Sequence, residues 1–144
     1  MPTIRFHLDS TLSAPELMAV LTDFSAARPE SWPTIDAEHF EVHALGENWA
    51  DVTEGTASAW EHAHYEWDTT RNRVEITTID SKVFGPGGGW VFQLTPIDGG
   101  GTRVDVELTR QPLTVKAKLL ATLLPLVAPS SLRKAFSVPL HATV

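Results

Sequence analysis

Segment 60–67, WEHAHYEW, holds the densest group of side chains that could carry chemistry. Alternate side chains of an extended strand share a face, so Trp60, His62, His64 and Glu66 lie together. An imidazole can remove a proton near neutral pH, and a neighbouring carboxylate can orient that imidazole or act as the acid. This face is therefore a candidate for proton abstraction beside a carbonyl, or for hydrogen bonding to the polar groups of a bound ligand.

Metal and nucleotide chemistry find weaker support. His-x-His is a spacing of metal ligands, and Glu66 or Asp51 could add an oxygen, but no further histidine occurs between His64 and His141. Cysteine is absent, which excludes thiolate-bound zinc, iron–sulfur clusters and a thiol nucleophile. The glycine-rich run 85–89 has no Lys-Ser or Lys-Thr after it and precedes a strand, so we interpret it as a flexible hairpin loop. No metal and no cofactor are expected.

The composition sets the class of protein. The chain of 144 residues is 42% hydrophobic and 20% charged, which predicts a single domain over residues 1–144 with a full apolar core. A net charge of -7 disfavours nucleic-acid binding. The longest apolar stretch, 119–129, has about half the length of a bilayer-spanning helix. With no cysteine to form disulfides, we expect a cytoplasmic protein without stable membrane insertion, either a monomer or a homodimer.

Hydrophobic periodicity predicts the elements that position these side chains. Residues 3–9 alternate as a strand, and Ser13 is the expected cap of a helix with Pro15 and Glu16 in its first turn. Six short strands follow, at about 39–45, 48–55, 59–67, 72–81, 89–97 and 102–110, and their short connections favour an antiparallel meander.

The core-facing positions are clear in the last three predicted strands. They are Val74, Ile76 and Thr78, then Trp90, Phe92 and Leu94, then Val104, Val106 and Leu108. A C-terminal amphipathic helix should begin at Pro112, kink or end near Pro125, and continue in a second segment up to Pro139.

Three segments also carry a resemblance to a known superfamily. They are 13–23 after the first strand, Tyr65-Glu66-Trp67-Asp68 at the end of a middle strand, and 89–96 followed by 100–106. With the order of elements, they resemble the START-like helix-grip superfamily, which includes polyketide cyclases and dehydrases and many lipid carriers. The resemblance implies an α+β fold: a curved seven-stranded antiparallel sheet around a proline-broken C-terminal helix, with one or two short helices after the first strand. It also implies a cavity between sheet and helix for an apolar or amphipathic molecule.

The resemblance also suggests where the candidate residues point. Matching Trp67-Asp68 to the strand end of the superfamily directs His62, His64 and Glu66 into the cavity. The opposite register would place Tyr65 and Trp67 in the core and the histidines in water. The remaining ligand-binding residues expected around the cavity are Trp60, Trp90, Phe92, Ile76 and Leu120.

Three functions stay open. The first is binding of a small hydrophobic or amphipathic ligand, as a carrier or sensor. The second is a polyketide cyclase/dehydrase-like enzyme, a lyase or isomerase, with His62, His64 and Glu66 as acid–base groups. The third is a protein-interaction module without a pocket.

Overall fold

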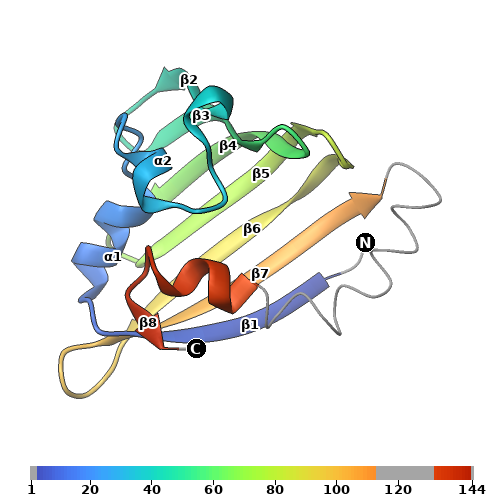
Figure 1. Cartoon of the computed structure of the whole chain (residues 1–144). Helices are drawn as coiled ribbons and strands as arrows, with labels where there is room; N and C mark the ends of the chain where they lie inside the picture. The colour runs from blue at the N-terminus through green and yellow to red at the C-terminus, as the bar shows by residue number, and fades with distance from the viewer. Residues whose placement is uncertain (1–2, 113–131, 144) are drawn as a thin grey trace.

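An antiparallel sheet organises the chain. The computed structural model describes residues 3–112 and 132–143, and its eight strands follow the order β2-β3-β4-β5-β6-β7-β1-β8 (Figure 1). The strands are β1 (Thr3–Ser10), β2 (Glu41–Leu45), β3 (Trp49–Thr56), β4 (Ala59–Asp68), β5 (Arg73–Ser81), β6 (Phe84–Pro96), β7 (Thr102–Pro112) and the two-residue β8 (Ala142–Thr143). The predicted antiparallel meander is therefore confirmed, with β1 paired to β7 and β8 added at the edge.

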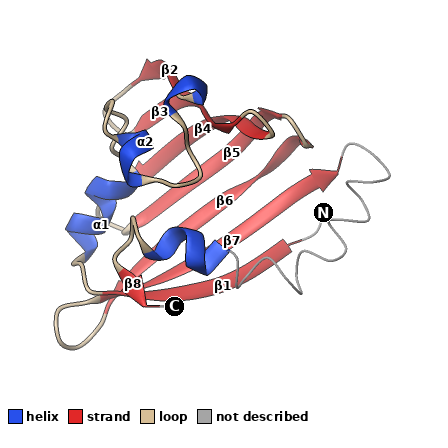
Figure 2. Cartoon of the chain, in the orientation of Figure 1, coloured by secondary structure: helices blue, strands red, loops and turns tan. Residues whose placement is uncertain are grey.

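The helices lie on one side of this sheet (Figure 2). They are α1 (Ala14–Leu21), α2 (Arg28–Ser31), the 3-10 turn η1 (Ala37–His39) and a helical segment at 132–137. We call the side of the sheet that bears them the inner face and the other side the outer face. No helix in the described part of the chain is both long and apolar enough to cross a membrane.

Local sequence explains where α1 begins. The Ser13 side chain accepts a hydrogen bond from the Glu16 backbone amide at 3.3 Å, and Glu16 Oε1 accepts one from the Ser13 amide at 3.2 Å. This reciprocal capping box satisfies two amides that the first helical turn leaves without partners. The predicted cap is confirmed, and it aims Leu17 and Leu21, both fully buried, at the inner face.

The core lies between the inner face and these helices. All three predicted sets of core-facing residues on β5, β6 and β7 are buried, except that Trp90 is half-buried. Phe136, in the 132–137 segment, packs against this surface, with its ring centroid 5.6 Å from that of Trp90 and 6.0 Å from that of Phe92. This agrees with the predicted second helical segment. The predicted start of the first helical segment is wrong, because Pro112 is the last residue of β7. The rest of that segment, Pro125 included, lies outside the described residues.

The glycine-rich run departs from the prediction. It forms no loop, because β6 already begins at Phe84 and its register against β7 shifts between Gly85 and Gly89. A Cβ at Gly89 would lie 1.9 Å from the Ile76 carbonyl oxygen, and one at Gly88 would lie 2.3 Å from the Thr109 carbonyl oxygen. These glycines therefore let the neighbouring backbones approach closely within the sheet.

Candidate functional site

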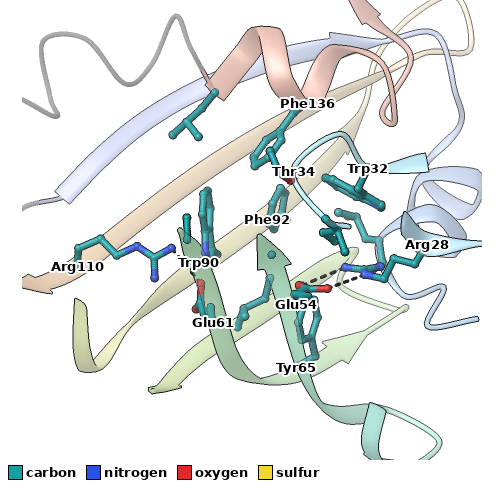
Figure 3. A pocket seen from close by; sticks show the side chains of 16 residues that line it. Arg28, Trp32, Thr34, Glu54, Glu61, Tyr65, Trp90, Phe92, Arg110 and Phe136 are labelled. Atoms are coloured by element: carbon teal, nitrogen blue, oxygen red, sulfur yellow. Dashed lines mark hydrogen bonds and ion pairs between the residues drawn. The ribbon is translucent and has the colours of Figure 1, made fainter. Parts of the chain in front are cut away.

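A cavity of about 170 Å³ opens between the inner face and the segments that cover it. The loop around α2 closes one side and the 132–137 segment another (Figure 3). Its described lining comprises Leu21, Arg28, Trp32, Thr34, Ile35, Glu54, Gly55, Ala59, Glu61, Tyr65, Ile76, Trp90, Phe92, Arg110, Leu132 and Phe136. Apolar and aromatic side chains thus surround a small number of charged and polar groups, which is the usual composition of a small-molecule site.

An aromatic wall forms one part of the lining. Trp90 stacks on Phe92 with ring centroids 6.2 Å apart, and Phe136 closes over both rings. Trp32 approaches Phe136 edge-on at 5.6 Å. Such a wall offers a ring or short apolar chain a large contact area with favourable aromatic geometry.

Arg28 is the centre of a buried polar group on the α2 side of the cavity. Its side chain is 3% exposed, and its Nε lies 2.8 Å from Glu54 Oε2. Nη2 donates to the Tyr65 hydroxyl at 3.1 Å, and that hydroxyl donates to Glu54 Oε1. Nη1 donates to the carbonyl oxygens of Leu21 at 3.2 Å and Asp23 at 2.9 Å. The guanidinium therefore ties the end of α1 and the whole of α2 to β3 and β4.

The surroundings fix the protonation of this group. Burial opposes the positive charge of Arg28, but the contacts with Tyr65 and Glu54 outweigh it, so the pKa of Arg28 is raised. Burial, reinforced by the nearby Glu54 carboxylate, raises the pKa of the Tyr65 phenol well above its usual value. Arg28 is therefore a cation and Tyr65 a neutral phenol over the whole physiological range.

A second ion pair lies across the aromatic wall from the first (Figure 3). Arg110 Nη2 donates to Glu61 Oε2 at 3.0 Å, with side chains 12% and 15% exposed, and Arg110 Nη1 donates to Thr78 Oγ1 at 3.0 Å. Thr78 in turn donates to Glu61 Oε1. The guanidinium carbon lies 5.2 Å from the ring centre of Trp90, within the range of a cation–π contact.

Comparison with known proteins tests the fold. No family model and no curated protein matches the sequence. Solved structures do match: the Thermus thermophilus protein TTHA0849 has a TM-score of 0.78 at 16% identity, covering 97% of this chain and 95% of its own. A START superfamily protein from Mycobacterium smegmatis has a TM-score of 0.74 at 15% identity, covering 96% and 97%. The chain has the START-like helix-grip fold.

A third neighbour belongs to the enzymes with this fold. The Zhui aromatase/cyclase of a Streptomyces species has a TM-score of 0.70 at 12% identity, covering 95% of this chain and 90% of that one. The resemblance inferred from sequence is therefore confirmed for the START-like fold. At such identities the likeness concerns architecture, because one fold carries many activities.

The START-like sheet places three of the expected ligand-binding residues at the cavity. Trp90, Phe92 and Ile76 all line it. Trp60 does not: it lies beside Phe40 and Thr53 in a depression on the outer surface. Leu120 lies outside the described residues.

The predicted direction of the β4 histidines is wrong. In the structure Ala63 and Tyr65 are buried on the inner face, with Glu61 and Trp67 on the same side, while His62, His64 and Glu66 lie on the outer face. The physical reason is burial: Tyr65 and Trp67 pack against Phe24, with ring centroids 4.9 Å and 5.9 Å from it. Two aromatic rings gain more from the core than three ionisable groups could.

The outer-face residues form a cluster of their own. His64 Nδ1 lies 2.6 Å from Asp51 Oδ1, and His64 Nε2 lies 3.1 Å from Glu66 Oε1. The hydrogen bond to Asp51 raises the pKa of His64, with burial opposing and Glu66 assisting. Trp49 stacks on the imidazole at 5.9 Å. Within the described residues no group of acidic, histidine or cysteine side chains has a geometry that could hold a metal ion.

Sequence reasoning missed the charged residues of the cavity. Arg28 stands in a proline-rich breaker, and Glu54 and Glu61 look like ordinary surface residues of strands. One signal was available: Tyr65 and Trp67 share an alternation phase with Glu61. If Tyr65 and Trp67 are assigned to the core, the same alternation places Glu61 on the inner face, where the cavity lies.

Proposed function

We propose that this START-like protein binds a small amphipathic molecule in the cavity between the inner face and the 132–137 segment. The observation that carries the proposal is the lining itself: aromatic rings with two Arg–Glu pairs at different sides of one partly open cavity. A partly open cavity with polar groups at its edge holds water when it is empty, and an amphipathic molecule that matches those polar groups can replace this water.

The volume points to the size of the occupant. About 170 Å³ is close to the roughly 150 Å³ of an engineered apolar cavity that accepts benzene, and lies below the roughly 300–1,000 Å³ of drug-sized sites. A compound built on a single ring therefore fits better than a long lipid. The existence of the cavity argues against an interaction module without a pocket.

Catalysis finds less support than binding. The proposed acid–base residues His62, His64 and Glu66 lie on the outer face, away from the cavity. All four carboxylate oxygens of Glu54 and Glu61 already accept a hydrogen bond from a protein side chain. Carboxylates engaged in this way are poorly placed to act as a general base, which must reach a proton of the substrate.

Calorimetric titration with phenol tests the proposal. We expect saturable binding with a Kd on the order of 0.1–1 mM, a common strength for a single-ring fragment. The variant Ala59→Phe adds a ring at an exposed position of the cavity rim and should abolish this binding. The matched variant His64→Ala, on the outer face, should bind as the original does. Absence of saturable phenol binding to the wild-type protein would overturn the proposal. So would a greater loss of phenol affinity in His64→Ala than in Ala59→Phe.

A further inference from the structure

Resting on that proposed function, we infer the chemical class of the ligand: an electrically neutral compound of single-ring size whose carbonyl or hydroxyl groups face the Arg110–Glu61 pair. The two observations behind this inference are the balance of charge in the described lining and the different surroundings of its two guanidinium groups.

The charge of the described lining sums to zero. Its ionised side chains are Arg28, Glu54, Glu61 and Arg110, and each arginine lies within 3.0 Å of one glutamate. Tyr65 adds no charge because burial keeps its phenol protonated. A charged ligand would therefore bring an uncompensated charge into a partly enclosed space lined mostly by apolar side chains, which is costly unless it finds a partner of its own.

The two arginines differ in what they can offer a ligand. A guanidinium has five N–H groups, and Arg28 donates four hydrogen bonds within the protein: to Glu54, to Tyr65 and to two backbone carbonyls. It is also enclosed by Phe24 and Trp32, at 4.6 Å and 5.4 Å from its central carbon. Arg28 is thus an anchor of the fold and cannot turn toward a ligand.

Arg110 is placed to contact one. Its described hydrogen bonds go to Thr78 and Glu61, and its guanidinium lies over Trp90 at the edge of the aromatic wall (Figure 3). A ring resting on Trp90 would present its polar substituent to this pair. A carbonyl oxygen there can accept from Arg110 without displacing Glu61, whereas a carboxylate would compete with Glu61 for the same cation.

Three compounds of nearly the same shape and different charge provide the test. Benzamide is neutral, benzoate carries a negative charge and benzamidine a positive charge at pH 7. In calorimetric titrations we expect benzamide to bind the wild-type protein at least about tenfold more tightly than either ion. This ratio of dissociation constants corresponds to about 1.4 kcal/mol of binding free energy. Equal or tighter binding of benzoate or benzamidine would overturn the inference while leaving a functional cavity. Absence of binding by all three would also overturn the inference, and if phenol does not bind either, the proposed function is overturned with it.

Two variants test whether the ion pair sets the charge preference. Glu61→Gln leaves Arg110 without its carboxylate, so the affinity ratio of benzoate to benzamide should rise at least about tenfold. Glu107→Gln removes a similar charge from the exposed pair with Arg5 on the outer face and should leave the ratio unchanged. An unchanged ratio in a folded Glu61→Gln protein would contradict the role of the pair. If that variant fails to fold, the comparison of the three compounds on the wild-type protein still decides the inference.

Discussion

Arg28 Nε lies 2.8 Å from Glu54 Oε2, in a pair whose side chains are 3% and 13% exposed. This contact joins α2, which covers the cavity, to β3 in the sheet. The Tyr65 hydroxyl bridges the two partners, donating to Glu54 and accepting from Arg28. The cover of the cavity is therefore attached through a buried polar network as well as through apolar packing.

Replacing Arg28 should strongly destabilise the protein. Arg28→Met keeps much of the apolar stem but leaves the Glu54 carboxylate without its cation, and removing one partner of a buried pair costs about 3–5 kcal/mol. The matched variant Arg5→Met breaks an exposed pair with Glu107 and should cost at most about 1 kcal/mol. Urea unfolding of both variants measures the difference. Equal losses in the two variants would contradict the role assigned to the network.

The order of elements could be predicted because its signals are local. Ser13 and Glu16 are three residues apart and cap α1 as expected. On β5 and β7 apolar and polar residues alternate cleanly, so that Val74 and Ile76, for example, were assigned to the core correctly. Such patterns need no knowledge of distant parts of the chain.

The cavity could not be predicted in the same way because its polar contacts join distant residues. Glu61 pairs with Arg110, 49 residues away, and Arg28 pairs with Glu54 and Tyr65, 26 and 37 residues away. A buried glutamate with a distant partner looks in sequence like a glutamate facing water. On β4 both faces carry ionisable residues, so the pattern did not show which face is buried, and the histidines were assigned to the inner face instead of the outer face.

The close approach of the β5 and β6 backbones at Gly89 leads to a further prediction. A Cβ there would lie 1.9 Å from the Ile76 carbonyl oxygen in the neighbouring strand, so Gly89→Ala must separate β5 from β6 and should cost about 3 kcal/mol. Gly99 has a φ of +95° but open space around it, so Gly99→Ala should cost about 1–2 kcal/mol from backbone strain alone. Chemical denaturation ranks the two. A larger loss in Gly99→Ala would show that the packing at Gly89 is misassigned.

The outer-face cluster predicts a pH dependence of stability. The pKa of folded His64 is raised, chiefly by its hydrogen bond to Asp51, above the roughly 6.5 of an unfolded histidine. The stabilisation that His64 contributes is therefore fully present below about pH 6.5 and is lost as the pH rises through the pKa of His64 in the folded protein. The difference in the free energy of unfolding between the wild-type protein and His64→Gln, measured by urea unfolding, should be smaller at about pH 8.5 than at about pH 5.5. A difference that grows with pH would reverse the sign of this account.

The most direct test of the central claim uses the tryptophan side chains as reporters. Trp90 and Trp32 line the cavity, whereas Trp49 stacks on His64 on the outer face. In a phenol titration of ¹⁵N-labelled protein, the indole N–H resonances of Trp90 and Trp32 should shift saturably while that of Trp49 stays in place. Unmoved cavity resonances, or a saturable shift confined to Trp49, would contradict ligand binding between the sheet and the 132–137 segment.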